Sequence, residues 1–163
     1  MEVDLVLADI IATDLSLDPT RVVVYNQNWD APTDEAIFII VATRRTSIIS
    51  SSNHYDYDTD EEVKSVSSFI YIDIEITSMD RTALERKEEI LMSLTSTYSL
   101  RQQEDNEISI FRTKDIIDLS EIDGSSALHR FRIPVIISQL KIKRTAVVPV
   151  DKFQPINLEV DAK

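Results

Sequence analysis

Cysteine is absent from this 163-residue sequence, and glycine occurs once, at Gly124. Without cysteine there is no disulfide framework, no thiolate nucleophile and no cysteine-based metal site. Average glycine usage is about 7%, so its near absence excludes phosphate-cradling loops that need several glycines. Tight Asn-Gly hairpins are excluded as well. The chain is therefore expected to turn through Asn, Asp, Ser and Pro.

Basic residues and long apolar runs are also scarce. The 17 Lys and Arg against 29 Asp and Glu give a net charge of −12. This argues against a protein that grips nucleic acid through phosphate contacts, which requires clustered basic residues. The longest apolar run, residues 36–42, is far shorter than the roughly 20 residues that span a bilayer. The acidic start, residues 1–4, differs from the basic start of a secretory signal, so we expect a cytosolic chain with no membrane partner.

The clearest structural pattern lies between residues 69 and 97. Residues 69–77 alternate, so that one face is wholly apolar and carries Ile70, Ile72, Ile74 and Ile76. This alternation predicts a strand. Apolar residues then recur at helical spacing from Asp80 to about Thr97, with Asp80 as the expected cap. A one-sided strand followed by a one-sided helix predicts an α+β domain.

The remaining elements complete this fold class. The sequence predicts a helix at 3–17, strands at 21–26, 37–43, 107–111 and 128–143, and a polar connector at 98–106. The apolar strand 37–43 is expected to be covered on both faces, with another subunit as one candidate cover. Segments 37–52 and 63–77 form a long hairpin, Trp29 is a packed anchor in the loop 26–32, and Pro134 places the last strand at an edge or a bulge. We predict a mostly antiparallel twisted sheet with two helices on one face, a single domain at 1–143 and an extended C-terminal arm at 144–163.

The acidic loop 53–62 contains a spacing that occurs in calcium sites. Asp56, Asp58 and Asp60 follow the i, i+2, i+4 pattern that opens an EF-hand loop. The glycine expected at position six is Glu61, and the glutamate expected at position twelve is Ser67. The sequence therefore favours an exposed acidic hairpin tip, formed by Asp56, Asp58, Asp60, Glu61 and Glu62.

No catalytic, metal-binding or cofactor-binding arrangement can be identified from spacing. The two histidines, His54 and His129, stand apart from any recognisable triad. A small acidic metal-dependent enzyme that uses His54, Asp56 and Asp58 remains as an alternative of a different class. The main prediction is a protein that is not an enzyme.

Basic residues on this acidic chain are candidates for a subunit or ring interface. They are Arg44, Arg45, Lys87, Lys141, Lys143 and Arg144. Lys87 falls within the apolar arc of the helix at 80–97, where its stem is expected to lie along the sheet while the ammonium reaches water. A salt bridge to an acidic residue on a strand or on a neighbouring subunit is the alternative.

Two local patterns and the order of elements carry a family resemblance. A strand, Asp80-Arg81 and a helix follow one another between residues 72 and 94, and the run 116–120 is followed by a short turn and then by residues 130–135. Over roughly residues 1–143 the chain resembles the tail-terminator, or neck-terminator, proteins of tailed bacteriophages.

The resemblance implies a structural virion protein located at the tail–neck junction, and in the host cytoplasm during assembly. Such proteins form a homohexameric ring that ends the tail tube and joins it to the head. The implied partners are further copies of the chain, the tail tube protein, a head-completion protein and, in a contractile tail, the sheath protein. DNA would pass through the ring without specific binding. Another connector or tube protein, and an acidic adaptor that mimics DNA, remain as alternatives.

Overall fold

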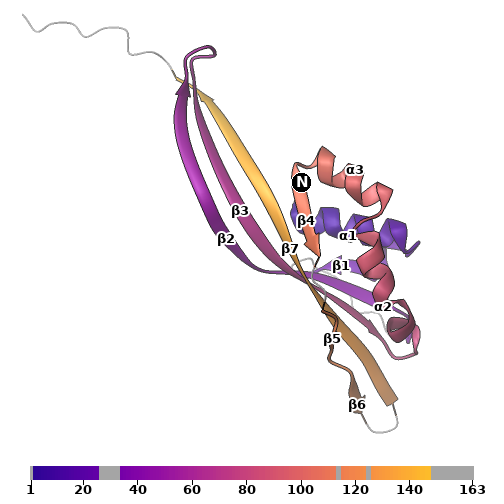
Figure 1. The fold of residues 1–163 in the computed structure, drawn as a ribbon. Helices are drawn as coiled ribbons and strands as arrows, with labels where there is room; N and C mark the ends of the chain where they lie inside the picture. The colour runs from indigo at the N-terminus through magenta and orange to yellow at the C-terminus, as the bar shows by residue number, and fades with distance from the viewer. Residues whose placement is uncertain (1, 26–33, 113–114, 124–125, 148–163) are drawn as a thin grey trace, which may run out of the picture.

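The computed structural model describes residues 2–25, 34–112, 115–123 and 126–147. Its elements, in chain order, are α1 (Val3–Asp14), a 3-10 turn (Pro19–Arg21), β1 (Val22–Val24), β2 (Phe38–Asp56), β3 (Glu61–Ser78), α2 (Thr82–Ser93), α3 (Thr97–Asp105), β4 (Ile108–Arg112), β5 (Ile117–Asp118), β6 (Glu121–Asp123) and β7 (Ser126–Ala146). Figure 1 shows one sheet with all three helices on the same side. The α+β class is confirmed.

The sheet is built around three long strands. Its order is β1-β2-β3-β7-β4, and β5 and β6 also pair with β7. The predicted hairpin is present, because β2 and β3 are antiparallel from the pair Phe38–Thr77 to the pair Asp56–Glu61. Among the described strands, β1 alone is parallel to its neighbour, β2.

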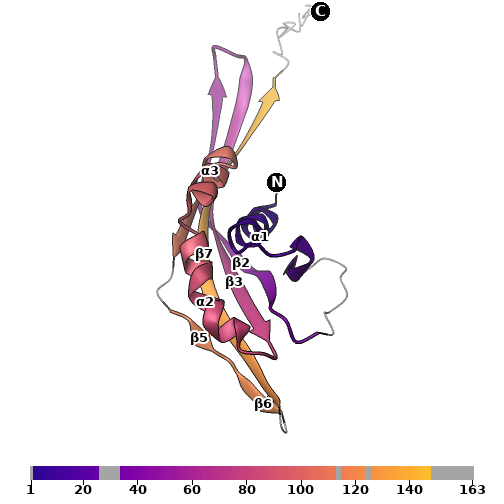
Figure 2. The same cartoon turned by 90° about the vertical axis from the view of Figure 1, so that its right-hand side faces the viewer.

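The core lies between the three helices and the face of the sheet that they cover. The alternating isoleucines Ile70, Ile72, Ile74 and Ile76 are buried there, as predicted. Figure 2 shows α2 and α3 in line over β7, with α1 beside them. The helices bury an apolar side against these isoleucines, which stabilises both layers. None of the described helices is long and apolar enough to cross a membrane.

Three details of the helices differ from the sequence-based prediction. Helix α1 ends at Asp14, and the predicted helix at 80–97 is α2, which begins at Thr82. The N-cap position is Arg81 and not Asp80 as predicted, but the Asp80 Oδ1 does accept from the first helical N–H, that of Thr82, at 2.8 Å. The predicted polar connector 98–106 is wrong, since helix α3 occupies most of it. The Ser96 hydroxyl caps α3 by accepting from the Ser99 N–H at 2.9 Å.

The scarcity of glycine has a visible consequence at three turns. Ser16, Asp60 and Glu107 each have φ of 52°, a conformation that costs a residue with a Cβ about 1–2 kcal/mol. Ser16 follows α1 in a Schellman arrangement, in which the Leu17 N–H donates to the Ala12 carbonyl at 2.9 Å. The position is one that glycine usually fills. The prediction that Asn, Asp, Ser and Pro would form the turns is confirmed at Ser16 and Asp60, whereas Glu107 was not among the expected residue types.

The last strand lies inside the sheet, because β7 pairs with β3 on one side and with β4 and β5 on the other. The prediction of an edge position for it is therefore wrong. Pro134 is accommodated locally: the β4 register ends opposite Val135 and the β5 register begins opposite Arg132, so Pro134 lies between them. Strand β7 also continues past residue 143 to Ala146, beyond the predicted domain boundary. The rest of the C-terminal arm and Trp29 lie outside the described residues.

The upper part of the sheet extends beyond the helices as a projecting three-stranded arm (Figure 1). We call residues 43–55, 63–68 and 139–147 the shaft, and residues 56–62 the tip. Residues 43–54 are all exposed, whereas residues 37–42 of the same strand are buried apart from half-buried Ile40. Phe38 and Ala42 are already buried in the single chain, so the proposed subunit cover for strand 37–43 is not needed. At about 3.3 Å per residue, the arm is about 45 Å long.

Candidate functional site

Glu75 holds a network of charges where the arm joins the body. It lies on β3, on the face opposite the helices, and its side chain is only 5% exposed. It accepts hydrogen bonds from Arg130 on one oxygen and from Arg132 on the other, the latter at 2.8 Å, while the Arg44 guanidinium reaches it at 3.2 Å. These partners lie on strands β2 and β7. One carboxylate therefore joins the three long strands.

The arginines also decide the ionisation of Glu75. Burial raises the pKa of its carboxyl, but hydrogen bonds and charges from Arg130 and Arg132 outweigh burial and hold the pKa below its usual value. A buried carboxylate of this kind is stable only while its cationic partners are present. The network is accordingly a structural one, since every described charge in it is paired.

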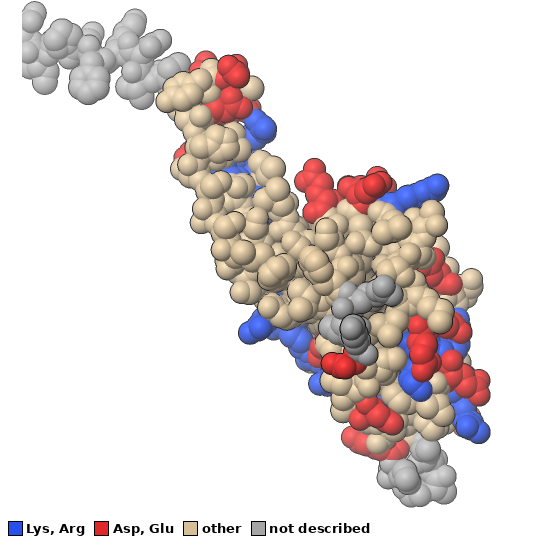
Figure 3. Space-filling model, viewed as in Figure 1, with Lys and Arg blue, Asp and Glu red and all other residues tan. Residues whose placement is uncertain are grey.

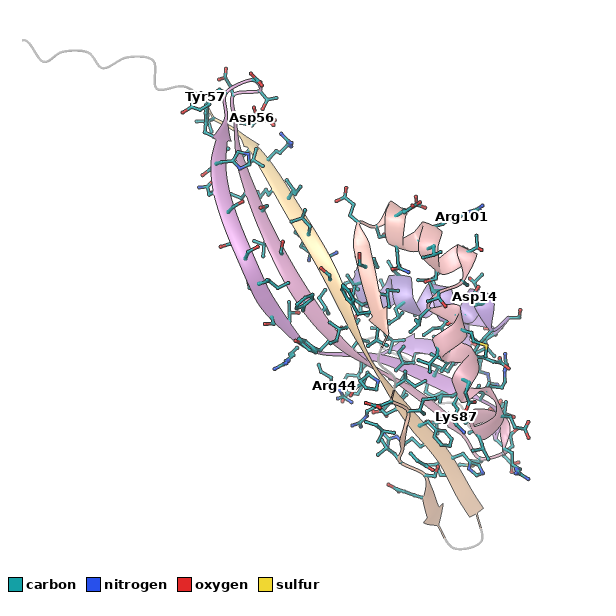
Figure 4. The ribbon with its side chains drawn as sticks, viewed as in Figure 1. Asp14, Arg44, Asp56, Tyr57, Lys87 and Arg101 are labelled. Carbon is teal, nitrogen blue, oxygen red and sulfur yellow. The ribbon has the colours of Figure 1, made fainter. Side chains whose placement is uncertain are left out.

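A β-bulge in β2 brings two consecutive arginines to this face. The pairing shifts between Thr43 and Arg45, which leaves Arg44 as the extra residue. The Arg44 Nε donates to Asp73 at 2.8 Å, and the Arg45 guanidinium lies 4.1 Å from the centre of the Tyr71 ring. Bulges bend a strand and increase its twist. Figure 4 shows Arg44 at the junction, pointing away from the helices.

The tip is an acidic turn, as the sequence predicts. The Tyr55 hydroxyl donates to Asp60 at 2.9 Å, and the Asp58 N–H donates to Asp56 at 3.1 Å. That N–H bond lowers the pKa of Asp56 below its usual value. The loop is shorter than the predicted 53–62. Strand β2 continues to Asp56 and β3 begins at Glu61, so only residues 57–60 lie between the strands. Figure 4 shows Asp56 and Tyr57 at the far end of the arm.

The shaft has the opposite charge. It contains no Asp or Glu and six basic residues, namely Arg44, Arg45, Lys64, Lys141, Lys143 and Arg144. Arg144 contacts the tip carboxylates Asp56 and Glu61 at 3.5 and 3.4 Å, and Lys64 pairs with Glu62 at 2.9 Å. Lys141 and Lys143 pair with no carboxylate of the described residues. The basic residues predicted from sequence thus gather on one part of the fold, apart from Lys87.

Lys87 makes its contacts within the chain. Its Nζ donates to the Leu84 carbonyl at 3.1 Å and lies 4.7 Å from the centre of the Phe131 ring. The side chain is 19% exposed and its Nζ approaches Glu88 at 3.6 Å. The stem lies toward the sheet as expected, but the ammonium lies against the Phe131 ring of β7 instead of reaching into water. Its acidic neighbour, Glu88, is on the same helix and not on a strand as the alternative supposed.

Apolar side chains of the arm face solvent. Ile48, Ile49, Leu140 and Ile142 are between 44% and 60% exposed. Beside β2, β1 ends at Val24, and beside β7, β4 reaches only Gln139, so both edges of the shaft are unpaired in the described chain. Exposed strand edges readily pair with other chains. These features give the shaft the character of an interaction surface.

Two of the hollows beside the helices differ in the residues that line them. The first, of about 320 Å³, is at the base of the arm and is lined by residues of α1, β2, β3 and β7. Gln139 lies there with its Oε1 buried and without a hydrogen-bond partner. The second, of about 300 Å³, is lined by Asp14, Leu15, Glu89, Met92, Ser93 and Ser96. Its lining contains acidic and apolar residues but no basic one.

The histidines are not part of a common site. His54 lies on the shaft, and its neighbours in a shallow surface hollow include Asn53, Tyr55 and Glu62. His129 is on β7 at the opposite end of the hairpin, where it pairs with Ser78. Within the described parts of the chain, no three His, Asp or Glu side chains come together in a way that could hold a metal.

Sequence reasoning missed Glu75 and its arginines as a connected group. A signal was present, because Asp73 and Glu75 interrupt the outer face of a strand while Arg130 and Arg132 alternate on another. The missing information was the register that places Glu75 opposite Arg132.

Comparison with protein-family models and with curated proteins found no match.

Proposed function

We propose that this protein is a structural component of a bacteriophage virion, a tail terminator that forms a hexameric ring between the tail tube and the neck. It acts by assembly and not by catalysis. In this proposal the ring ends the growth of the tube, docks to a head-completion protein, and lets DNA pass through its centre. The net charge of −12 favours passage, because acidic walls repel phosphate.

The observation that carries the proposal is the projecting arm. A small sheet gains stability by covering an apolar face, yet the shaft leaves five large apolar side chains exposed and both of its edges unpaired in the described chain. Contact with another chain would cover them. A chain that offers one patch to a different patch on its neighbour forms rings when the rotation closes.

The test is the assembly state of the full-length chain. We expect light scattering after size exclusion, together with negative-stain imaging, to show six-fold rings, either alone or in the presence of the tail tube protein. We also expect the rings to cap tube ends and stop elongation. A chain that stays monomeric in both conditions would refute the proposal.

Co-purification separates the terminator from the nearest alternative. A head-closure or tube protein would stack on a different ring, so tagged protein should recover tube and neck proteins together only if it joins them. Recovery of a basic, nucleic-acid-binding protein instead would favour the adaptor alternative.

A further inference from the structure

The charges of this molecule are divided among its parts. The shaft carries six basic residues and no acidic one, whereas the rest of an acidic chain supplies all 29 Asp and Glu. Seven of these acidic residues are exposed or half-buried on the three helices, namely Asp9, Asp14, Glu85, Glu88, Glu89, Glu104 and Asp105. The same helices carry three basic residues, Arg86, Lys87 and Arg101. Figure 3 shows acidic side chains with fewer basic ones over the helical side of the body, and acidic side chains at the tip, while the shaft between them is almost free of red.

The basic side of the shaft is not explained by contacts within the chain. Lys64 and Lys143 lie directly opposite each other on β3 and β7. Like charges in this position destabilise a sheet. Lys141 is two residues from Lys143 and so lies on the same face. Glu62 offsets one of the three charges, and Lys141 lines the hollow at the base of the arm together with Glu2 and Asp4, without an ion pair to either. Lys143 has no carboxylate partner among the described residues, so an external anion would relieve the repulsion there.

The helices have the complementary defect. Asp14 is the last residue of α1, where a carboxylate faces the negative end of the helix dipole, and no basic residue lies in the last turn. Among the described residues, no Lys or Arg pairs with Asp14. It lines the hollow of about 300 Å³ that also contains Glu89 and Met92, and Met92 is 68% exposed. Glu89 is already paired with Arg86 at 2.8 Å, and Arg86 also donates to the Leu15 carbonyl, so Asp14 is the carboxylate of this hollow that has no cationic partner among the described residues. A carboxylate beside an apolar wall suits the charged head and apolar stem of a lysine.

We propose that the basic face of the shaft of one copy docks on the acidic helical layer of a second copy, with a shaft lysine entering the hollow at Asp14. This inference rests on the proposed ring and names the two surfaces that meet in it. The two surfaces differ, so the contact is head to tail, as a ring requires. A face about 45 Å long and about 14 Å wide offers roughly 600 Å², which approaches the ~800 Å² that each partner contributes to a standard interface.

Nucleic acid fits the shaft less well than a protein surface does. Arg44, Arg144 and Lys64 already contact carboxylates. Ile48 pairs with Ser68 and so lies on the face of Lys64, whereas Leu140 and Ile142 alternate with the lysines of β7 and lie on the other face. Phosphate binding needs free cations in number. The lysine face combines few free cations with an exposed isoleucine, which suits a protein surface better than a nucleic acid.

A charge swap tests the contact. Lys141→Glu with Lys143→Glu makes the shaft acidic, and Asp14→Lys with Glu88→Lys makes the helical layer basic. Each variant alone opposes like charges in every contact and should assemble at a concentration about tenfold or more above that of the wild type. An equal mixture restores opposite charges in every contact of an alternating ring, so it should assemble as the wild type does. Because the altered residues are exposed, circular dichroism should show an unchanged fold.

The controls separate this proposal from the ring itself. The single variant Lys143→Glu is compared with Arg81→Glu as a matched control. Arg81→Glu makes the same change of charge at an exposed site outside both surfaces, so the control should leave assembly unchanged. Normal rings from either double variant alone, or no rings from the mixture, would overturn the contact while the ring stands. A wild type that never assembles overturns both. Wild-type binding to a short DNA duplex that is lost in the shaft variant would assign the shaft to nucleic acid and also overturn the contact.

Discussion

The body and the arm are made from the same three strands but are stabilised differently. In β3, residues 70–76 place an isoleucine on the helix side at every second position, and these side chains are buried. Further along the same strand, residues 64–68 place Lys, Val and Ser on that side. The backbone pairing continues unchanged between β3 and β7 throughout. Strand formation here depends on pairing, whereas burial depends on which side chains the sequence supplies.

The largest expected loss of stability comes from truncating a buried side chain in the body. Ile74 is fully buried, and we expect Ile74→Ala to lower the free energy of unfolding by about 4 kcal/mol, through lost burial and the cavity that remains. Urea denaturation at a concentration where the chain is monomeric measures this loss. A loss below about 1 kcal/mol would show that the core is not where the structure places it.

Removing the Glu75 carboxylate at the junction should lower the free energy of unfolding slightly less than Ile74→Ala does. Glu75→Ala leaves its arginines without their partner, and we expect a loss of about 3 kcal/mol at neutral pH. The pKa of Glu75 is lowered in the folded state, so its contribution is present above the unfolded value of about 4.3 and disappears as pH falls through the folded value. The difference between wild type and variant should therefore shrink in acid. A difference that stays constant with pH would contradict the role of its charge.

Glycine at the left-handed turns should stabilise the body moderately. Ser16→Gly and Glu107→Gly remove the steric cost of positive φ at two helix ends, and we expect each to raise the free energy of unfolding by about 1 kcal/mol. Thermal unfolding checks this. Thr13→Gly, within helix α1, provides the opposite control, because glycine in a helix interior is about 0.3 kcal/mol less favourable than threonine, so this variant should gain no stability.

The smallest effect is expected in the arm. Ile48→Thr and Ile142→Thr alter side chains that are 60% and 52% exposed, so monomer stability should change by less than about 0.5 kcal/mol. Amide hydrogen exchange should also be faster in the shaft than at residues 70–76, because few buried apolar contacts protect it. Equal protection in both regions would remove the distinction between body and arm.

Much of the fold follows from alternation in the sequence. The alternating isoleucines predict which face of β3 is buried. The sequence also predicts that the preceding long segment, β2, pairs with β3 as a hairpin, and both features are present. Helix α3 was missed because its only buried residue is Ser99, so no apolar stripe marks it. Pro134 was misplaced because a break between β4 and β5 accommodates a proline inside a sheet, and such a break depends on distant pairing.

The candidate surface was predictable only as a set of basic residues. Lys141, Lys143 and Arg144 are close in sequence, but Lys64 joins them through the β3–β7 register alone. The absence of acidic residues from the shaft also becomes visible only when three separate segments are placed side by side. Charge segregation of this kind is a property of the fold and not of any local motif.

The continuity of β3 from Glu61 to Ser78 has a mechanical consequence. Strand β3 has no break where it leaves the helices, although the bulge at Arg44 bends its neighbour β2 there, so β3 joins the arm to the body as one continuous strand. A force applied at Tyr57 would be transmitted along the covalent backbone into the isoleucine layer. It would also place the hydrogen bonds between β3 and its neighbours β2 and β7 under shear. A neighbour that grips the shaft would thereby strain the interior of the molecule directly.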